Sequence, residues 1–378
     1  MSAKTKVTEL FALANIKVGE DIIVHEEGLY DRILAHGSLG FGEAYMDGWW
    51  DAPELDDLMY KIIKARLPDK VSPWRMVLPV LSAKLRNKQS KARAFQVGEQ
   101  HYDTGNDLFE VMLGERMVYT SAYWKDLEKV SANLDQAQEN KLDLVCKKIG
   151  LQKGQHVLDI GCGWGSFAKF AVEKYGAKVT GVTVSKEQME LAEKRCTGLD
   201  VSFKLQDYRD LTGMYDHVIS LGMFEHVGGK NYRTYMEVVQ RVIKDDGLFL
   251  LQTIGHNRND TGVDPWIEKY IFPNGMIPQS SMVCRAFEGL FIMEDWHNFG
   301  ADYDVTLMAW HDRFERAWPH LATLKDKDGA IKYSERFHRM WRYYILACAG
   351  AFRARNTIEL WQIVLSKNGV PGGYESIR

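Results

Sequence analysis

The residues best suited to bind a ligand lie near the middle of the chain, where a short apolar segment runs into glycines. The segment Val157-Leu-Asp-Ile-Gly-Cys-Gly-Trp-Gly165 carries glycine at alternate positions. Glycine lets a ligand lie against the backbone, and open α/β sheets bind ligands at the carboxyl ends of their strands. The same pattern also fits a tight turn between a strand and a helix that binds nothing.

The spacing of these glycines bears on the type of ligand. A dinucleotide-binding loop has the pattern Gly-x-Gly-x-x-Gly, whereas the pattern here is Gly-x-Gly-x-Gly. A dinucleotide fold also places an acidic residue after its second strand to bind the ribose, but Thr183 and Gln188 stand there. A nicotinamide dehydrogenase is therefore an alternative that these residues disfavour.

The elements that must position this loop alternate between strand and helix. We predict strands at 156–160, 178–183, 201–205, 215–220 and 248–251. Helices are expected over 166–175, 186–196 (with Ser185 as its N-cap) and 232–242. Such alternation predicts parallel strands with helices on both faces. We then expect an irregular insertion up to about 290, a strand at 291–296, helices at 303–318 and 332–354, and a strand at 360–365.

The N-terminal part of the chain has a different pattern. Residues 1–72 combine a turn-rich stretch at 37–43 with an amphipathic helix predicted over 54–66, so we expect a small helical domain there. A linker over 73–93 follows, and its segment 84–93 holds five Lys and Arg residues and no acidic one. This segment is either a solvated face or a patch that meets anionic lipid, where each charge adds roughly 1 kcal/mol.

Composition limits the class of protein. The net charge of −3 over 378 residues argues against a nucleic-acid partner. Five widely spaced cysteines without a CxxC or Cys/His cluster argue against both disulfides and a metal site, and favour a reducing compartment. No signal-like segment and no long apolar run is present, so we expect a cytoplasmic protein whose contact with lipid is peripheral.

The glycine-rich segment resembles the signature of S-adenosylmethionine-dependent methyltransferases of the seven-stranded, Rossmann-like kind. Seven further blocks are similar to those of the cyclopropane-fatty-acyl-phospholipid synthases: Gly37–Trp50, Val182–Gln188, Gln206–Asp210, Gly222–Gly228, Val263–Gly275, Glu294–Tyr303 and Ala347–Arg353. The resemblance covers nearly the whole chain. It implies an α/β fold with helices on both faces of a seven-stranded sheet, and a catalytic domain over 94–378 with an acyl-binding insertion at about 255–320.

The resemblance also implies a reaction. The enzyme would transfer a methylene group from S-adenosylmethionine to the cis double bond of unsaturated acyl chains in membrane phospholipids. An isolated alkene is a weak nucleophile, so the sulfonium methyl must be held close and aligned with it. Methyl transfer leaves a carbocation, and a base must then remove a proton from the new methyl so that the ring closes. Water must be excluded, because it would trap the cation.

Cofactor-binding residues follow from the resemblance, position by position. Gly161 and Gly163 would approach the methionine portion, beside Asp159 of the same motif. The remaining expected contacts are Thr183 and Gln188 at the ribose, Gln206 and Asp207 at the adenine, and Tyr119 and Thr120 closing over the cofactor.

The base implied by the resemblance is a bound bicarbonate ion held in a small polar cage. The expected cage consists of the side chains of Glu225, Tyr303 and Gln252 and the backbone N–H groups of Ser121 and Ile254. Two positions depart from the family pattern, because many members have Cys at position 121 and His at 252. A Gln amide donates a hydrogen bond to an anion but cannot carry a proton, which places the details of the cage in question.

Structural interpretations compete with these roles. Glu225 could be a charge that complements a helix dipole, and Tyr303 could be a core tyrosine at a helix start. Cys348 is a nucleophile by residue type, but no step of this reaction needs a thiolate, so we interpret it as a small side chain that packs a helix.

Three alternatives in function stay open. The chain could stop at methyl transfer or act on another acyl carrier, it could bind the cofactor without catalysis, or it could be the dehydrogenase considered above. As partners we expect a phospholipid bilayer with unsaturated acyl chains and a second copy of the chain in a homodimer. The protein would associate transiently with the inner face of the membrane.

Overall fold

The computed structural model describes residues 1–70, 105–258 and 263–378. The described residues form two compact units, each made from separated parts of the chain. One unit contains residues 1–70, 263–273 and 303–358, and the other contains 105–258, 274–302 and 359–378. The second unit holds the glycine-rich motif. The basic segment 84–93 lies outside the described residues, and the division into 1–72, 73–93 and 94–378 stays a prediction.

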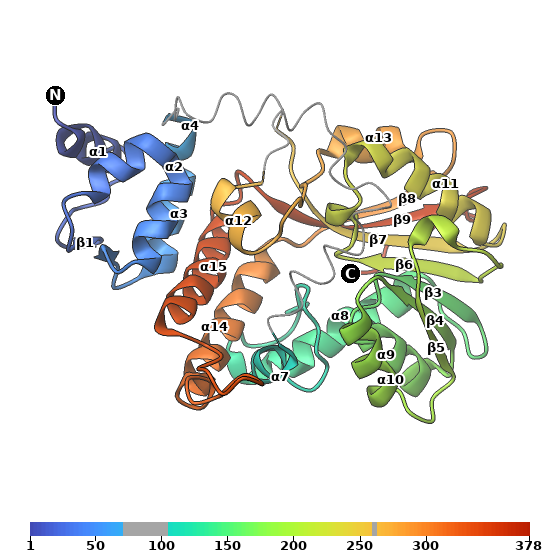
Figure 1. The fold of residues 1–378 in the computed structure, drawn as a ribbon. Coiled ribbons are helices and arrows are strands. Elements are labelled where there is room, and N and C mark those ends of the chain that lie inside the picture. Colours follow the sequence, from blue (N-terminus) through green and yellow to red (C-terminus); the bar gives the residue numbers. More distant parts are fainter. Residues whose placement is uncertain (71–104, 259–262) are drawn as a thin grey trace. The chain divides into compact units, whose positions relative to one another are not determined.

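The second unit is built on a sheet of seven strands in the order β5-β4-β3-β6-β7-β9-β8 (Figure 1). The strands are β3 (His156–Ile160), β4 (Lys178–Thr183), β5 (Val201–Leu205), β6 (His217–Leu221), β7 (Leu248–Gly255), β8 (Ile292–Asn298) and β9 (Glu359–Ser366). Every predicted strand is present, most within one or two residues of the expected bounds. The predicted seven-stranded fold is therefore confirmed.

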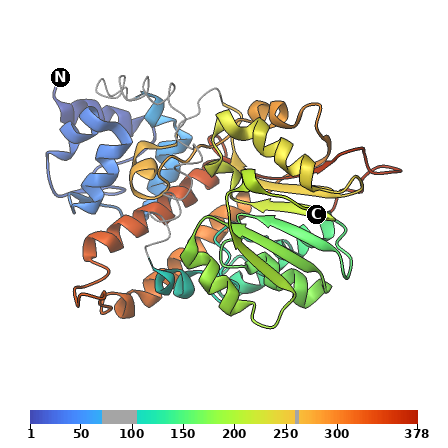
Figure 2. The ribbon, with the colours of Figure 1, turned by 45° about the vertical axis from the view of Figure 1, so that its right-hand side comes forward.

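Pairing within this sheet is not uniform. The first five strands pair in parallel, with Asp159 of β3 opposite Gly181 of β4 and Ile219 of β6. The prediction of parallel strands for the part of the chain that alternates between strand and helix is therefore confirmed, whereas strand β9 is antiparallel to both β7 and β8. The turned view of Figure 2 shows the twist that the strands accumulate across the sheet.

Helices cover both faces of this sheet, as predicted. Helices α8 (Leu134–Lys148), α9 (Ser166–Tyr175) and α10 (Lys186–Arg195) lie on one face, and α11 (Tyr232–Val242) and α13 (Ser280–Phe287) lie on the other (Figure 1). Alternate strand residues feed two cores, since Val157 packs towards α8 and α9 while Leu158 packs towards α11. The predicted cap is present too, because Ser185 Oγ accepts a hydrogen bond from the Gln188 N–H.

Short helices complete the second unit. They are α7 (Asn106–Leu113) and the 3₁₀ turns η2 (Ser131–Asn133), η3 (Tyr208–Asp210), η4 (Phe224–His226) and η5 (Gly229–Asn231). The insertion after β7, expected to be irregular, contains α13 and also α12 (Pro265–Tyr270), which belongs to the first unit. Asp264 caps α12, since its side chain accepts hydrogen bonds from the Trp266 and Ile267 N–H groups.

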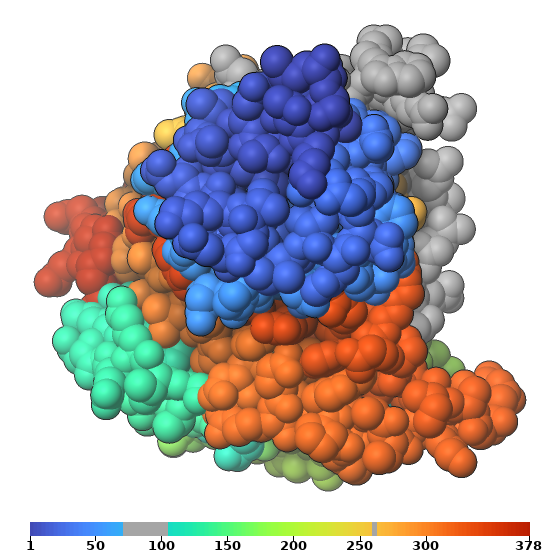
Figure 3. Space-filling model, turned by 90° about the vertical axis from the view of Figure 1, so that its left-hand side faces the viewer, coloured from blue at the N-terminus to red at the C-terminus, as the bar shows by residue number. Residues whose placement is uncertain are grey.

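The first unit is helical. It contains α1 (Ala3–Ala12), α2 (Leu29–Met46), α3 (Leu55–Lys64), α4 (Leu67–Lys70), α12, α14 (Ala301–Leu321, from Tyr303 on) and α15 (Glu335–Ala354), with the short strands β1 (Ile23–Val24) and β2 (Trp50–Asp51). Helix α15 packs against α3 and α2. In the space-filling view of Figure 3, the orange atoms of α14 and α15 adjoin the blue N-terminal atoms.

The stretch 37–43 was predicted to be rich in turns, but this prediction is wrong because the stretch lies inside helix α2. The helix is interrupted at Gly37, where the backbone leaves helical geometry. At position 42 a side chain has no room, since a Cβ there would lie 2.5 Å from Cδ1 of Trp266. The indole nitrogen of Trp266 also approaches the Met46 sulfur at 3.3 Å. Trp266, more than two hundred residues away in sequence, therefore packs directly against the backbone of Gly42.

Other sequence expectations can be compared directly. All five cysteines are free thiols, as expected for a chain without disulfides. No helix within residues 1–70, 105–258 and 263–378 has the length and hydrophobicity of a membrane-spanning segment.

We predict that Gly42→Ala lowers the free energy of unfolding by about 1–3 kcal/mol, because the new methyl group would overpack against the Trp266 ring. Urea unfolding measures this change. Gly28→Ala is the control. Gly28 already has right-handed backbone angles, and the nearest atom to a Cβ there would be at the tip of the Trp49 side chain, 3.3 Å away. Equal stability of the Gly42 variant and the unmodified protein would contradict this account of the packing.

Candidate functional site

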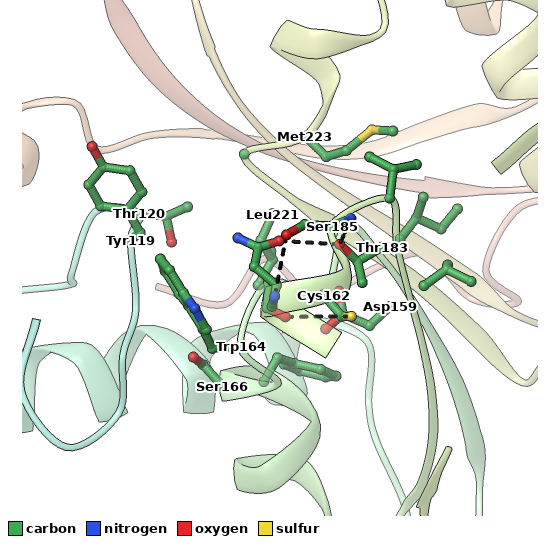
Figure 4. Close-up of a pocket in the computed structure, with 18 of the residues that line it drawn as sticks. Tyr119, Thr120, Asp159, Cys162, Trp164, Ser166, Thr183, Ser185, Leu221 and Met223 are labelled. Carbon is green, nitrogen blue, oxygen red and sulfur yellow. Dashed lines mark hydrogen bonds between the residues drawn. The ribbon is translucent and has the colours of Figure 1, made fainter. Parts of the chain in front are cut away.

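One pocket of the second unit lies at the carboxyl ends of β3, β4 and β6, and we call it the central pocket (Figure 4). Its lining includes all nine residues predicted to bind a cofactor: Tyr119, Thr120, Asp159, Gly161, Gly163, Thr183, Gln188, Gln206 and Asp207. They come from four separate stretches of sequence. Figure 4 shows Tyr119 and Thr120 on the side opposite Thr183.

The glycine loop after β3 forms the floor of this pocket. Gly161 has φ of +85°, a left-handed conformation that residues with side chains rarely adopt. A Cβ at this position would also lie 2.7 Å from Cβ of Met223, which follows β6. The Gly161 N–H donates to the carbonyl of Val182, so the loop is tied to the end of β4. Glycine thus lets the loop turn tightly while the pocket stays open above it.

The end of β4 presents a small polar network to the pocket. Thr183 Oγ1 donates to Gln188 Oε1 at 3.2 Å and accepts from the Ser185 N–H at 3.1 Å. All three residues are buried. The network holds the Gln188 amide at the start of α10, where it can meet the hydroxyl groups of a ribose.

The segment after β5 carries a second polar group. Both oxygens of the Asp207 carboxylate accept hydrogen bonds from Arg209, from its backbone N–H at 2.9 Å and from its guanidinium at 3.0 Å. The guanidinium also lies 4.8 Å from the Tyr208 ring centroid. Gln206 donates to the Asp210 carbonyl at 2.6 Å. This turn therefore presents one anchored carboxylate and an aromatic ring to a flat ligand such as a purine.

Aromatic residues form another wall. The Trp164 indole N–H donates to Asn106 Oδ1 at 3.0 Å, and its ring lies 4.9 Å from that of Phe109. Tyr119 packs edge-on against Phe109 at 5.0 Å. The wall links α7 to the glycine loop. Trp164 was not among the residues predicted for the site, because a tryptophan inside the motif fits core packing equally well.

The pocket lining also contains a buried lysine that was not predicted from the sequence. Lys141 is 1% exposed, and its Nζ donates to Thr120 Oγ1 at 3.0 Å. Asp159, which is 2% exposed, lines the same pocket. Burial lowers the pKa of Lys141 to about 7 and raises that of Asp159 to about 7. The sequence does indicate that this lysine is buried, because Lys141 falls on the apolar stripe of α8 between Ala137 and Val145.

Glu225 lies in η4, between the pocket-lining residues Met223 and His226. Its Oε1 accepts a hydrogen bond of 2.6 Å from the Ile254 N–H at the end of β7. Its Oε2 is buried and has no hydrogen-bond partner in the part of the chain that the structure describes. Burial raises the pKa of this carboxyl to about 7. Burial likewise lowers the pKa of His226 to about 4, so that imidazole is neutral near pH 7.

Gln252 lies on β7, two residues before Ile254, and is fully buried. Its Oε1 accepts from Gln362 of β9 at 3.0 Å, while its Nε2 has no partner among residues 1–70, 105–258 and 263–378. Ser121 is also fully buried, and its hydroxyl donates to the Ala122 carbonyl. The second unit thus contains four of the five residues predicted for the anion cage.

Two further residues considered for catalysis, Tyr303 and Cys348, belong to the first unit. Tyr303 is buried on α14, where its ring stacks on Phe352 at 4.5 Å and lies edge-on to Trp310 at 6.0 Å. Cys348 lies on α15, and burial raises its pKa to about 12. A thiol with so high a pKa stays protonated and is a poor nucleophile, in line with the packing role expected for it.

Comparison with known proteins places this geometry in a family. The family model of mycolic acid cyclopropane synthetase matches residues 89–363. A cyclopropane-fatty-acyl-phospholipid synthase of Escherichia coli is 50% identical over 98% of this chain and 94% of its own length. A probable fatty acid methyltransferase of Pseudomonas putida is 34% identical over 77% of this chain and 74% of its own.

Solved structures agree with the sequence relatives. A mycolic acid cyclopropane synthase in complex with SAH and CTAB superposes with a TM-score of 0.63 at 27% identity, over 72% of this chain and 98% of its own. Family model, sequence relatives and structure thus coincide with a sheet whose central pocket gathers nine residues expected to hold S-adenosylmethionine. The chain belongs to the mycolic acid cyclopropane synthetase family and is a methyltransferase dependent on S-adenosylmethionine.

Proposed function

We propose that this chain transfers a methylene group from S-adenosylmethionine to the cis double bond of unsaturated acyl chains in membrane phospholipids, forming cyclopropane rings. The observation that carries the proposal is the likeness to the Escherichia coli synthase, which is 50% identical over 98% of this chain. A match of this extent favours conservation of the reaction as well as of the fold.

Cofactor binding is assigned to the central pocket. The backbone at Gly161 and Gly163 leaves room for the methionine portion, and the Thr183–Gln188 network meets the ribose hydroxyls. Asp207, held by Arg209, accepts a hydrogen bond from the adenine amino group. The aromatic wall with Tyr119 excludes water from the sulfonium, which keeps the electrophile from being hydrolysed and the later cation from being trapped.

The residues around Glu225 fit a small oxyanion such as bicarbonate. Gln252 Nε2 supplies a buried donor without a partner in the described part of the chain, and Glu225 Oε2 supplies a buried acceptor of the same kind. When bound there, bicarbonate would supply a base for the proton lost from the transferred methyl. Glu225 would accept a hydrogen bond from the hydroxyl of this ion and so orient it, and Gln252 would donate to its negative charge.

Two features qualify the cage expected from sequence. The Ile254 N–H already donates to Glu225, so its role is to orient this carboxylate rather than to contact the anion. Gln252 donates without carrying a proton, so the proton must leave by another group or by exchange with solvent. Tyr303 belongs to the first unit, and its contact with the ion remains part of the proposal.

Association with the membrane is a further part of the proposal. The basic segment 84–93 supports transient binding to anionic lipid on the inner face of the membrane, and a homodimer would keep one copy attached while the other works. Vesicle cosedimentation tests the electrostatic part. Binding that depends on neither salt nor anionic lipid would contradict it.

A methyltransferase that does not close the ring is the second candidate. The 34% identity to a probable fatty acid methyltransferase favours it, because the same cation can lose a proton from the acyl chain instead of from the new methyl. The two candidates share the cofactor pocket and differ only in where the base acts.

We predict that vesicles with cis-unsaturated phospholipids gain one methylene per double bond when incubated with the protein, S-adenosylmethionine and bicarbonate. Mass spectrometry measures the gain, and ozonolysis reports whether the double bond has been lost. Vesicles with fully saturated chains are the control and should stay unchanged. A product of the same mass that is still cleaved by ozone would support the second candidate instead, and measurable cofactor binding with no product would point to another acceptor.

We predict that Glu225→Gln lowers kcat by roughly 100-fold or more, the usual effect of losing a group that positions proton transfer. Because the pKa of Glu225 is raised to about 7, the carboxylate of the unmodified enzyme protonates as pH falls through 7, and its rate should fall with it. The variant should lose this inflection. Steady-state rates measured from roughly pH 5.5 to 9 test both expectations.

We predict that the protonation of Glu225 affects the free energy of unfolding in the direction opposite to its effect on the rate. The folded pKa of Glu225 lies above its ordinary value of 4.5, so its contribution favours the folded state at low pH and is lost as pH rises from about 4.5 through about 7.

Glu237→Gln is the control, because Glu237 pairs with Arg233 on the exposed side of α11. A Glu225 variant with the unmodified kcat and pH profile would exclude the proposed role.

A further inference from the structure

Two glutamine side chains meet inside the sheet of the second unit. Gln252 of β7 and Gln362 of β9 lie directly opposite each other in the antiparallel register, and both are fully buried. Two residues along each strand, on the same face, the opposite pair is Leu250 with Val364, which belongs to an apolar core. An apolar pair would also fill the place of the glutamines without the cost of burying two amides, so packing does not explain them.

The hydrogen bond between the two amides decides which end of Gln252 is available to a ligand. Gln362 Nε2 donates to Gln252 Oε1 at 3.0 Å. The oxygen of Gln252 is therefore occupied, while its Nε2 donor has no partner in the part of the chain that the structure describes. If this amide were turned over, it would present its oxygen instead, and an oxygen repels an anion. The direction of this one hydrogen bond thus decides whether Gln252 can bind an anion.

The charges at the two ends of this row of side chains favour the observed direction. On the side of β8, His297 lies opposite Gln362, and burial lowers the pKa of its imidazole to about 4, so the ring is neutral near pH 7. Next to this ring lies a cluster of two positive side chains and one negative one, Lys148, Arg378 and Asp295. On the side of β6, the carboxylate of Glu225 is bound to the backbone of β7. Amide dipoles between a positive cluster and a carboxylate are most stable with their N–H ends towards the carboxylate.

We propose that Gln362 is a positioning residue, which holds the N–H end of Gln252 towards the anion site beside Glu225. This inference rests on the proposed function, since it takes the residues around Glu225 as a site for bicarbonate. Many members of the family have His at position 252, and Gln362 allows a glutamine to serve there as the donor. Gln362 acts through Gln252 rather than on the ion itself.

Fixing the donor in advance lowers the cost of binding the ion. The terminal torsion of a glutamine is broad and roughly two-fold, so a Gln252 amide without its neighbour could present either end. An ion would then bind only the fraction of molecules whose N–H end faces it, and its apparent affinity would fall by that fraction. The hydrogen bond from Gln362 removes this loss, because the competent orientation is already populated.

The test measures bicarbonate affinity from the rise in unfolding temperature with bicarbonate concentration. The protein is saturated with S-adenosylhomocysteine, and chloride is the ionic control. We expect Gln362→Met to weaken the bicarbonate affinity roughly 10-fold and Gln252→Met to weaken it roughly 10- to 100-fold, the range for losing a hydrogen bond to a charged group. The affinity for S-adenosylhomocysteine, measured by calorimetry, should stay the same in both variants.

A double-mutant cycle separates positioning from a structural role. If Gln362 acts through Gln252, then Gln362→Met should have no further effect on the bicarbonate affinity of the Gln252→Met protein. Gln138→Met is the matched control and should keep the full bicarbonate affinity. Gln138 of α8 is also fully buried, its Nε2 donates to the Leu113 carbonyl at 2.9 Å, and its oxygen has no partner among the described residues.

Three results from the variants would overturn the inference. The first is an unchanged bicarbonate affinity in Gln362→Met. The second is a loss of the same size whether or not Gln252 is present. The third is an equal loss in Gln138→Met, which would show that the affinity follows the removal of any buried amide.

A crystal structure of the unmodified protein with bicarbonate needs no variant to fold. The ion should lie beside the amide atom of Gln252 that faces away from Gln362, and an ion bound elsewhere would overturn the inference. Failure of the unmodified protein to bind bicarbonate would overturn the anion site and this inference together. The vesicle assay reports on the proposed reaction separately, because it detects the product whether or not bicarbonate binds.

Discussion

Parallel pairing of β3 with β4 on one side and with β6 on the other is the constraint on which the site depends. The chain winds outward from β3 to β5, returns, and winds outward again through β6 and β7, so the connections diverge next to β3. The carboxyl ends of these strands leave a crevice at this point, as open α/β sheets do where strand order reverses. Gly161, Thr183 and Gly222 meet there although they are far apart in sequence.

Burial then determines the chemistry that this crevice can support. Glu225, Asp159 and Lys141 each have a pKa near 7 because the protein removes water from them without supplying a full counter-charge. A dry site strengthens the few hydrogen bonds that remain, such as the one from Ile254 to Glu225. In the proposed reaction the same dryness would protect the carbocation from water. One physical property would then serve cofactor binding, orientation of the base and survival of the reactive intermediate.

Local patterns predicted most of the second unit. Helices at 166–175 and 232–242 and strands at 156–160 and 178–183 have the expected bounds, because hydrophobic period and glycine position decide them locally. Long-range packing decided the rest. Gly42 of α2 makes room for Trp266, and β9 runs antiparallel beside a strand more than a hundred residues earlier. Neither of these contacts leaves a local signature.

In the proposed reaction, the base removes a proton from the methyl group that the cofactor has just delivered. The most direct measurement supplies S-adenosylmethionine with a trideuterated methyl group to unsaturated phospholipid vesicles and counts the deuterium in the product by mass spectrometry. We expect a product that retains two of the three deuterium atoms, in a ring that resists ozonolysis. A product that retains all three would contradict it, because the proton would then have come from the acyl chain and the new methyl would have stayed intact.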